Sequence, residues 1–171
     1  GKALEELQGI LGRYPTKQAA LLPALWVGQR ERGGISDRNM TEVAEALGVT
    51  PAYVKGVVTF YTMYNRRPIG KYHIQVCRSL MCALVGTDNL LGWIHAKLGI
   101  KTGQTTPDGF FTLSQVECLG SCGTGPMMQV NDDYYERLTQ GKTSRILDDL
   151  KREGKCALAT GPFMFPEPVQ K

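Results

Sequence analysis

The sequence lacks the long apolar runs and nucleotide-binding loops that define several common protein classes. No stretch approaches the about 20 apolar residues needed to span a bilayer, and Glu5, Glu6 and Arg13 interrupt any secretory signal near the start. No G-x-G-x-x-G motif follows a predicted strand, and no phosphate-binding loop with Lys-Ser or Lys-Thr is present. We therefore expect a soluble intracellular protein without direct membrane insertion, and we expect any nucleotide chemistry to take place on another chain.

Histidine is also scarce, and no catalytic set of side chains is visible. The two histidines, His73 and His95, fall on an expected strand and an expected helix. Histidines in such places are more often structural than catalytic, and no nucleophile is paired with a general base in a recognisable motif. The sequence thus predicts no catalytic residue in this chain.

The composition is that of an ordinary globular protein, with 42% apolar and 21% charged residues among 171. The formal net charge of +4 is small, and the basic residues are scattered in short groups that usually mark solvated surfaces. The charge therefore gives little support to nucleic-acid binding. The length permits one domain or two small ones.

The first part of the chain, residues 1–68, predicts a bundle of helices. Apolar residues recur at helical spacing in four segments, which begin near residues 4, 18, 38 and 51. Thr50 and Pro51 suit the N-cap and first position of the fourth helix. We expect that helix to bury Val54, Val57, Val58 and Tyr61. The sequence changes character at residues 66–70, which we take as the domain boundary.

Residues 69–155 predict a second domain with the element order β-α-β-β-α, which is that of a thioredoxin-like domain. We expect strands at 72–76 and 110–117, helices at 88–98 and 143–153, and a hairpin around 131–133. Residues 156–171 are rich in proline and glycine and predict an extended C-terminal tail. The predicted fold class is α+β or α/β, with a helical bundle before the mixed domain.

Five cysteines are the most informative residues of the sequence. Cys77 and Cys82 form a Cys-x4-Cys pair, Cys118 and Cys122 form a Cys-x3-Cys pair 35 residues later, and Cys156 is single. An odd number of cysteines in a chain expected to be intracellular argues against a disulfide framework. Because each pair lies in a loop directly after a predicted strand, the two loops can meet at one edge of the sheet. We predict that the four paired cysteines bind a metal centre and that Cys156 does not.

Four thiolates favour a [2Fe–2S] cluster, with two ligands for each iron. Zinc stays an alternative because thiolates bind it well, although zinc sites usually have closer ligand spacings. Neither pair has the Cys-x-x-Cys spacing of a thioredoxin-type redox site. The second loop contains three glycines, which let the backbone approach the sulfur atoms. We also expect the hydroxyl groups of Ser121 and Thr124 to donate to cluster sulfur.

Four segments of the sequence are specific in combination: GVVTFY at 56–61, VCRSLMC at 76–82, TPDG at 106–109 and VECLGSCGTGPMMQVNDD at 116–133. Together they resemble the 24-kDa-type [2Fe–2S] subunit of respiratory complex I, the NADH–quinone oxidoreductase. The similarity extends over about residues 4–150. The resemblance implies a thioredoxin-like [2Fe–2S] ferredoxin domain after an N-terminal helical bundle. It also implies one cluster, whose ligands in the family fall on Cys77, Cys82, Cys118 and Cys122.

The resemblance further implies an electron-carrier role within an oxidoreductase that translocates ions. In this family the cluster exchanges single electrons with FMN on a flavoprotein subunit that also binds NADH, and further Fe–S subunits belong to the same complex. The implied location is cytoplasmic, peripheral on the cytoplasmic face of the inner membrane, or the matrix side in a eukaryote. NAD-reducing hydrogenases and NAD-dependent formate dehydrogenases contain related subunits and are the alternative assemblies.

Residues 40–61 suggest a different function, because they resemble a DNA-binding helix-turn-helix and would make the chain an Fe–S redox-sensing regulator. A recognition helix presents Arg, Lys, Asn or Gln to base edges. The second helix here offers Tyr53, Lys55 and a few hydroxyls, and is otherwise apolar. We therefore predict no nucleic-acid partner. A stand-alone ferredoxin is a third interpretation, but a small shuttle does not need the helical extension.

Two smaller expectations concern residues near the cysteines. Gly125-Pro126 precedes the predicted hairpin, where thioredoxin-like folds place a cis-proline, so we predict a cis peptide bond there. Arg78 lies between the first two cysteines, where it either offsets the negative charge of the cluster or is simply solvated.

Overall fold

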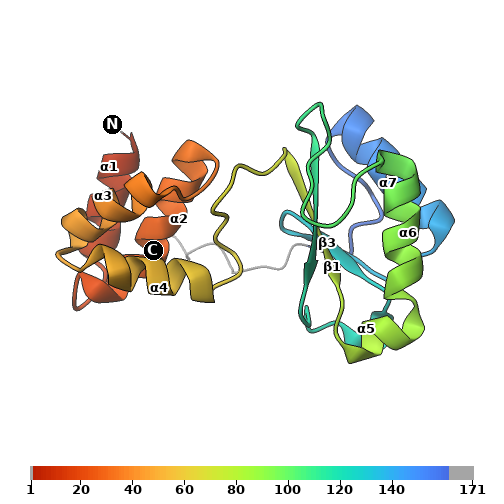
Figure 1. Cartoon of the computed structure of the whole chain (residues 1–171), viewed down its shortest axis with the longest axis horizontal. Helices are drawn as coiled ribbons and strands as arrows, with labels where there is room; N and C mark the ends of the chain where they lie inside the picture. Colours follow the sequence, from red (N-terminus) through yellow and green to blue (C-terminus); the bar gives the residue numbers. More distant parts are fainter. Residues whose placement is uncertain (1, 162–171) are drawn as a thin grey trace. The chain divides into compact units, whose positions relative to one another are not determined.

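The computed structural model describes residues 2–161 of the chain. The chain divides into two compact units, residues 1–69 and residues 70–171, which are drawn in Figure 1. Of the predicted C-terminal tail, residues 162–171 lie outside the described part. No helix of the described part is long and apolar enough to cross a membrane.

The first unit contains four α-helices joined by short turns. They are α1 (Lys2–Leu11), α2 (Leu21–Arg32), α3 (Asp37–Leu47) and α4 (Pro51–Phe60), and the short 3₁₀ helix η1 (Gln18–Ala20) precedes α2. The side chain of Ser36 caps α3 by accepting from the backbone N–H of Asn39, and the Thr50 side chain caps α4 by accepting from that of Tyr53. These side chains satisfy backbone donors that a helix start leaves unpaired.

The apolar stripe of α4 is shorter than the sequence predicts. Val54 and Val58 are buried and Val57 is partly buried, but Tyr61 keeps 39% of its surface exposed. The expectation for Tyr61 was wrong because α4 ends at Phe60. Tyr61 is its C-cap with an extended backbone, so its side chain leaves the helical stripe. The ring of Tyr61 instead makes an edge contact with Tyr64, with 6.5 Å between ring centroids.

The second unit is a four-stranded mixed sheet with the strand order β2-β1-β3-β4. The strands are β1 (Tyr72–Cys77), β2 (Phe111–Val116), β3 (Met128–Val130) and β4 (Asp133–Tyr135). Strands β1 and β2 are parallel, whereas β3 pairs antiparallel with both β1 and β4. The remaining helices are α5 (Leu80–Val85), α6 (Thr87–Leu98) and α7 (Gln140–Glu153). Helices α6 and α7 lie on the same side of the sheet and contact each other (Figure 1).

Side chains of β1 alternate between two environments, as the period of a strand requires. Tyr72, Ile74 and Val76 join the buried core formed with α6 and α7. His73 and Cys77 have the opposite parity and belong to the other side of the sheet. The ring of His73 is buried and its Nε2 lies 2.8 Å from the Ser114 hydroxyl on β2. His73 is therefore a hydrogen-bonded structural residue.

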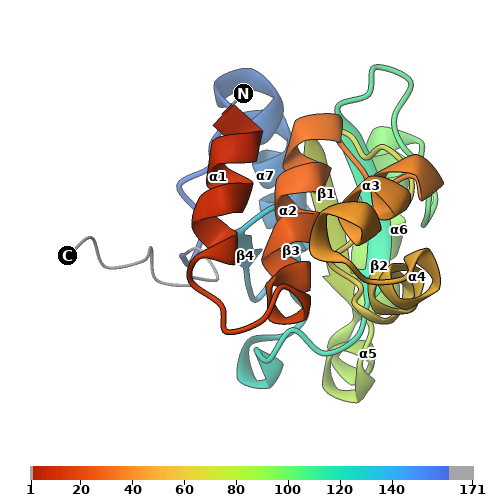
Figure 2. The same cartoon turned by 90° about the vertical axis from the view of Figure 1, so that its left-hand side faces the viewer.

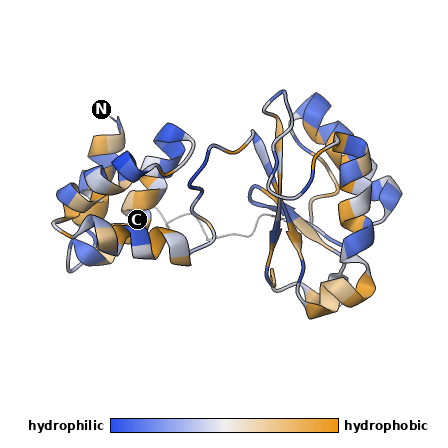
Figure 3. Cartoon of the chain, viewed as in Figure 1, coloured by the Kyte–Doolittle hydropathy of each residue, from blue (hydrophilic) through white to orange (hydrophobic). Residues whose placement is uncertain are grey.

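Helix α5 is an element that the sequence analysis missed. It has six residues, of which Leu80, Met81, Leu84 and Val85 are exposed, with exposed fractions of 70%, 47%, 72% and 49%. A short apolar run that stays at the surface shows no core-facing period, so periodicity does not detect it. Figure 3 shows this helix as an apolar patch at one end of the sheet. Cys82 therefore lies in a helix and not in a loop as expected.

The parallel pairing of β1 and β2 sets where the two cysteine segments lie. Cys77 at the end of β1 is opposite Val116 at the end of β2. The segments that follow β1 and β2 therefore leave the sheet at the same end. Figure 2 shows α5 and the teal turn after β2 at that end of the second unit.

Candidate metal centre

The first cysteine pair is buried, and packing holds it in place. Cys77 is the last residue of β1 and Cys82 lies within α5, with exposed fractions of 2% and 3%. Both pack against Met127, together with Leu119 and Tyr134. The hydroxyl of Thr87, the first residue of α6, donates to the Cys77 carbonyl at 2.8 Å. The apolar surroundings of these thiols exclude water from this half of the site.

The second cysteine pair is exposed and lies on a glycine-rich turn. Cys118 follows β2, and Cys122 begins the short 3₁₀ helix η2 (Cys122–Thr124). The two Sγ atoms are 3.5 Å apart. The backbone N–H of Gly120, which adopts the left-handed φ of 79°, donates to Cys118 Sγ at 3.3 Å. The glycine is required here because side chains rarely adopt that φ.

The charges of the two cysteine pairs influence each other's pKa values. All four are free thiols. Burial raises the pKa of Cys82 to about 11, and a hydrogen bond with Cys77 and the charge of Cys122 act in the same direction. The charge of Cys77 likewise contributes to the raised pKa of Cys122, after the larger effect of Cys118. All four cysteines thus lie near the end of the sheet where β1 and β2 finish.

The donor set consists of four thiols in two pairs, and thiolates are ligands of both zinc and iron–sulfur clusters. In the described residues 2–161, no group of three or more His, Cys, Asp and Glu that could hold a metal ion is present. A structural zinc site needs four ligands around one point, whereas a [2Fe–2S] cluster takes two thiolates for each iron. The four thiols are arranged as two pairs, which matches the second requirement.

The backbone also fits closely around the first pair. A Cβ at Gly125 would lie 3.3 Å from Cys82 Sγ and 2.8 Å from Val85 Cγ2, so only glycine leaves the room that these atoms occupy. The following Gly125–Pro126 bond is cis, which confirms the prediction. The backbone N–H of Met127 then donates to the Cys82 thiol and lowers its pKa in part. Hydrogen-bond donors to a ligand sulfur are a typical feature of iron–sulfur sites.

The hydroxyl groups of the second loop have different partners from those expected. Ser121 Oγ and Thr124 Oγ1 both donate to the carboxylate of Glu136, and not to cysteine sulfur. The Tyr134 hydroxyl donates to the Leu119 carbonyl at 2.7 Å. Sequence reasoning missed Glu136 and Tyr134 because they lie on the far side of the hairpin. The available signal was the hairpin itself, which returns the chain toward the second cysteine pair.

Arg78 is exposed beside Glu117, whereas Cys156 is buried in the main core of the second unit. The Nε of Arg78 is 3.6 Å from Glu117 Oε1, and both side chains are largely exposed, which weakens such an ion pair. Cys156 is buried in the core on the helix side of the sheet, and its Sγ lies 3.5 Å from Asp149 Oδ2. Burial raises the pKa of Cys156, so its thiol stays protonated.

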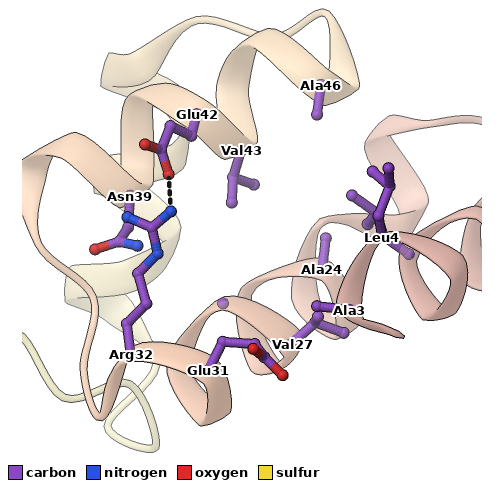
Figure 4. A pocket seen from close by; sticks show the side chains of 12 residues that line it. Ala3, Leu4, Ala24, Val27, Glu31, Arg32, Asn39, Glu42, Val43 and Ala46 are labelled. Carbon is purple, nitrogen blue, oxygen red and sulfur yellow. Dashed lines mark ion pairs between the residues drawn. The ribbon is translucent and has the colours of Figure 1, made fainter. Parts of the chain in front are cut away.

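A separate groove of about 340 Å³ lies in the first unit between α1, α2 and α3 (Figure 4). Its lining is mostly apolar, and an ion pair of 2.8 Å between Arg32 and Glu42 borders one side. The residues that line it, all within the described part, include no cysteine or histidine. The groove has none of the chemistry of the cysteine site.

Residues 7–151 match the family model described as thioredoxin-like [2Fe-2S] ferredoxin. The chain belongs to this family. It is 42% identical over 147 residues to a subunit of the NADH-quinone oxidoreductase of Rhizobium meliloti, covering 86% of this chain and 88% of the relative. It is 43% identical over 162 residues to NADH-quinone oxidoreductase subunit 2 of Thermus thermophilus, covering 88% and 90%. These relatives confirm the resemblance to the [2Fe–2S] subunit of NADH–quinone oxidoreductase.

A solved structure supports the same fold. An NAD+-reducing [NiFe]-hydrogenase in the H2-reduced state matches with a TM-score of 0.66 and 20% identity, over 78% of this chain and 22% of that chain. At this identity the match concerns the fold alone. The family assignment confirms the thioredoxin-like fold class and a [2Fe–2S] cluster as cofactor.

Proposed function

We propose that this chain is the one-electron carrier subunit of the NADH-oxidising module of NADH–quinone oxidoreductase. Its cluster is held by Cys77, Cys82, Cys118 and Cys122. The observation that carries the proposal is the placement of these cysteines, as two pairs, at the end of the sheet where β1 and β2 finish. Relatives named as subunits of that oxidoreductase, at 42–43% identity over most of both chains, support the assignment of the complex.

When bound, the cluster supplies a site that accepts and returns one electron, and the chain's own residues determine its surroundings. The four cysteines lose their thiol protons on binding, because thiolates and not thiols are metal ligands. Gly125 leaves room beside Cys82, and Met127 and Gly120 direct backbone N–H groups to the sulfur atoms of Cys82 and Cys118. The protein contributes binding and electrostatics, and the NADH chemistry belongs to a partner.

The partner is a flavoprotein subunit that binds FMN and NADH, within a complex that contains further Fe–S subunits. The exposed apolar face of α5 supports a protein contact at this place, since it lies on the helix that carries Cys82. Exposed apolar side chains gathered on one element often mark a protein interface. An interface here brings the partner beside the cluster, as electron exchange requires. The complex would hold the chain peripherally at the cytoplasmic face of the inner membrane, or at the matrix face in a eukaryote.

An NAD-reducing hydrogenase or an NAD-dependent formate dehydrogenase is the second candidate assembly. This candidate comes from the family resemblance, and the fold match to the NAD+-reducing hydrogenase agrees with it in fold alone. The relatives of higher identity favour the NADH–quinone oxidoreductase.

The test is anaerobic purification of the complete chain from its own cells, with iron and sulfide analysis and EPR after reduction. We expect two irons and two sulfides per chain, a rhombic signal of a reduced [2Fe–2S] cluster, and a copurifying FMN protein. Leu84→Asp should retain the cluster and lose the flavoprotein, and Leu4→Asp, an exposed leucine of the first unit, is the matched control. A single zinc in place of iron would refute the cofactor site, and copurification with hydrogenase subunits would favour the second assembly.

A further inference from the structure

Glu136 makes an unusual set of contacts for a carboxylate next to a proposed metal centre. It follows β4 directly and is partly buried. Its Oε1 accepts from Ser121 Oγ and, at 2.5 Å, from Thr124 Oγ1, while these two hydroxyl groups lie 2.5 Å apart. Both donors flank Cys122. One carboxylate thus holds both hydroxyl groups of the second cysteine loop.

Residues 134–138, which include Glu136, lie alongside the second cysteine loop and hydrogen-bond to it at several positions. Two residues earlier, the Tyr134 hydroxyl donates to the Leu119 carbonyl at 2.7 Å. Beyond Glu136, the backbone N–H of Arg137 donates to the Thr124 carbonyl at 2.7 Å, and that of Leu138 donates to the Pro126 carbonyl at 3.0 Å. The second cysteine pair is exposed and lacks the apolar burial of the first within the described part of the chain, so these hydrogen bonds fix the loop.

Glu136 stays charged in this position. Hydrogen bonds from Ser121 and then Thr124 lower the pKa of its carboxyl group and outweigh partial desolvation. Hydrogen bonds to an ionised acceptor are stronger than those between neutral groups. The hydroxyl groups of Ser121 and Thr124 thus bond to the carboxylate and to each other, and Thr124 also donates to the Ser121 carbonyl at 3.1 Å. In the described part of the chain, neither hydroxyl donates to a cysteine sulfur.

The hydrogen bonds that Glu136 takes from the two hydroxyl groups and its negative charge both affect the reduction potential of the cluster. Reduction adds one electron and one negative charge to the cluster. Donors to sulfur favour that added charge, whereas a nearby negative charge opposes it. Glu136 removes two donors from the sulfur atoms and adds a fixed negative charge next to the loop. We propose that Glu136 is a positioning residue that holds the second cysteine loop in place and keeps the reduction potential of the cluster low. The proposal rests on the proposed cluster site.

The test is an EPR-monitored redox titration of the purified chain with its cluster, comparing Glu136→Gln with the wild type. Glutamine keeps an oxygen acceptor of the same reach and loses the charge. We expect the midpoint potential to rise, by up to about tenfold in the one-electron equilibrium, which corresponds to about 59 mV. Glu136→Asp keeps the charge and should stay nearer the wild type. Glu153→Gln, an exposed carboxylate at the end of α7, is the matched control for net charge and should leave the midpoint unchanged.

Hydrogen exchange of residues 118–126 provides a readout that does not need the potential. We expect faster exchange in Glu136→Gln than in Glu153→Gln. This comparison still tests the inference if Glu136→Gln retains too little cluster for a redox titration. A midpoint and an exchange pattern equal to those of the control would overturn the inference. If the wild type contains two irons in that case, the proposed cluster site stands; a wild type without iron contradicts the proposed function itself.

Discussion

The two cysteine pairs of the site are held by different forces. Cys77 and Cys82 are buried, and apolar packing against Met127 fixes them. Cys118 and Cys122 are exposed, and hydrogen bonds from the end of β4 fix their loop. One half of the site is thus buried in a small apolar cluster, while the other half depends on a few hydrogen bonds and on the packing of Leu119 against that cluster. We expect substitutions in the first half to affect folding and cluster together, and substitutions in the second to affect the cluster more selectively.

Ligand substitutions should produce the largest effects and should reveal this difference. Alanine at any of the four paired cysteines removes a ligand, and we expect loss of the cluster. Serine should be tolerated better in the exposed pair, because a buried hydroxyl without a partner costs about 1–3 kcal/mol. Iron content and visible absorption should therefore fall further in Cys82→Ser than in Cys122→Ser. Cys156→Ala is the control and should leave the spectrum unchanged. Equal losses in the two serine variants would contradict the contrast between the pairs.

Gly125→Ala tests the close packing around the first pair. The added Cβ would lie 3.3 Å from Cys82 Sγ and 2.8 Å from Val85 Cγ2, and of these two side chains only the exposed Val85 can move away easily. Overpacking typically costs about 1–3 kcal/mol, so we expect a lower midpoint of thermal unfolding and a shorter cluster lifetime. In Gly123→Ala the new Cβ meets nothing within 4 Å. That variant should behave like the wild type, and equal destabilisation of both would argue against a special role for Gly125.

Tyr134→Phe tests the polar support of the second pair. It removes the hydrogen bond to the Leu119 carbonyl, whose net value is about 1 kcal/mol, while the ring continues to pack on the first pair. We expect faster hydrogen exchange at residues 118–124 and little change at residues 72–77. Tyr14→Phe, at an exposed tyrosine of the first unit, is the control. Uniformly faster exchange in both segments would mean that the two halves are not separately held.

Replacing His73 should give the smallest effect. His73 lies on β1, which ends at Cys77, and the expected change is in the pH dependence of the free energy of unfolding. Burial lowers the pKa of His73 in the folded state, so below about pH 6.5 the unfolded chain binds a proton more readily than the folded chain. The free energy of unfolding should therefore fall as the pH decreases through that value. Urea unfolding at pH 7.5 and 5.5 should show a smaller decrease in His73→Gln than in the wild type or in His95→Gln. An unchanged decrease would assign the pH dependence to other groups.

The sequence predicted those parts of the fold that depend on strong local patterns. The cap residues Ser36 and Thr139 start their helices about where apolar periodicity suggested. Cys118 follows β2 as expected, Cys77 is the last residue of β1, and Cys82 lies in a helix that was not predicted. Helix α5 was missed because its apolar residues face outward, and Tyr61 was misplaced because α4 ends one residue earlier. Glu136 was missed for another reason. Its partners are 12 and 15 residues away in the sequence, and only the hairpin geometry brings them together.

The parallel register of β1 and β2 has a consequence for how such sites vary among proteins. Residues 99–110 lie between α6 and β2, at the end of the sheet opposite to α5 (Figure 1). Extra residues inserted there would lengthen the interval between Cys82 and Cys118 and leave every sulfur atom where it is. We therefore expect metal binding to constrain the number of residues within each cysteine pair, whereas the number of residues between the pairs can vary among related proteins.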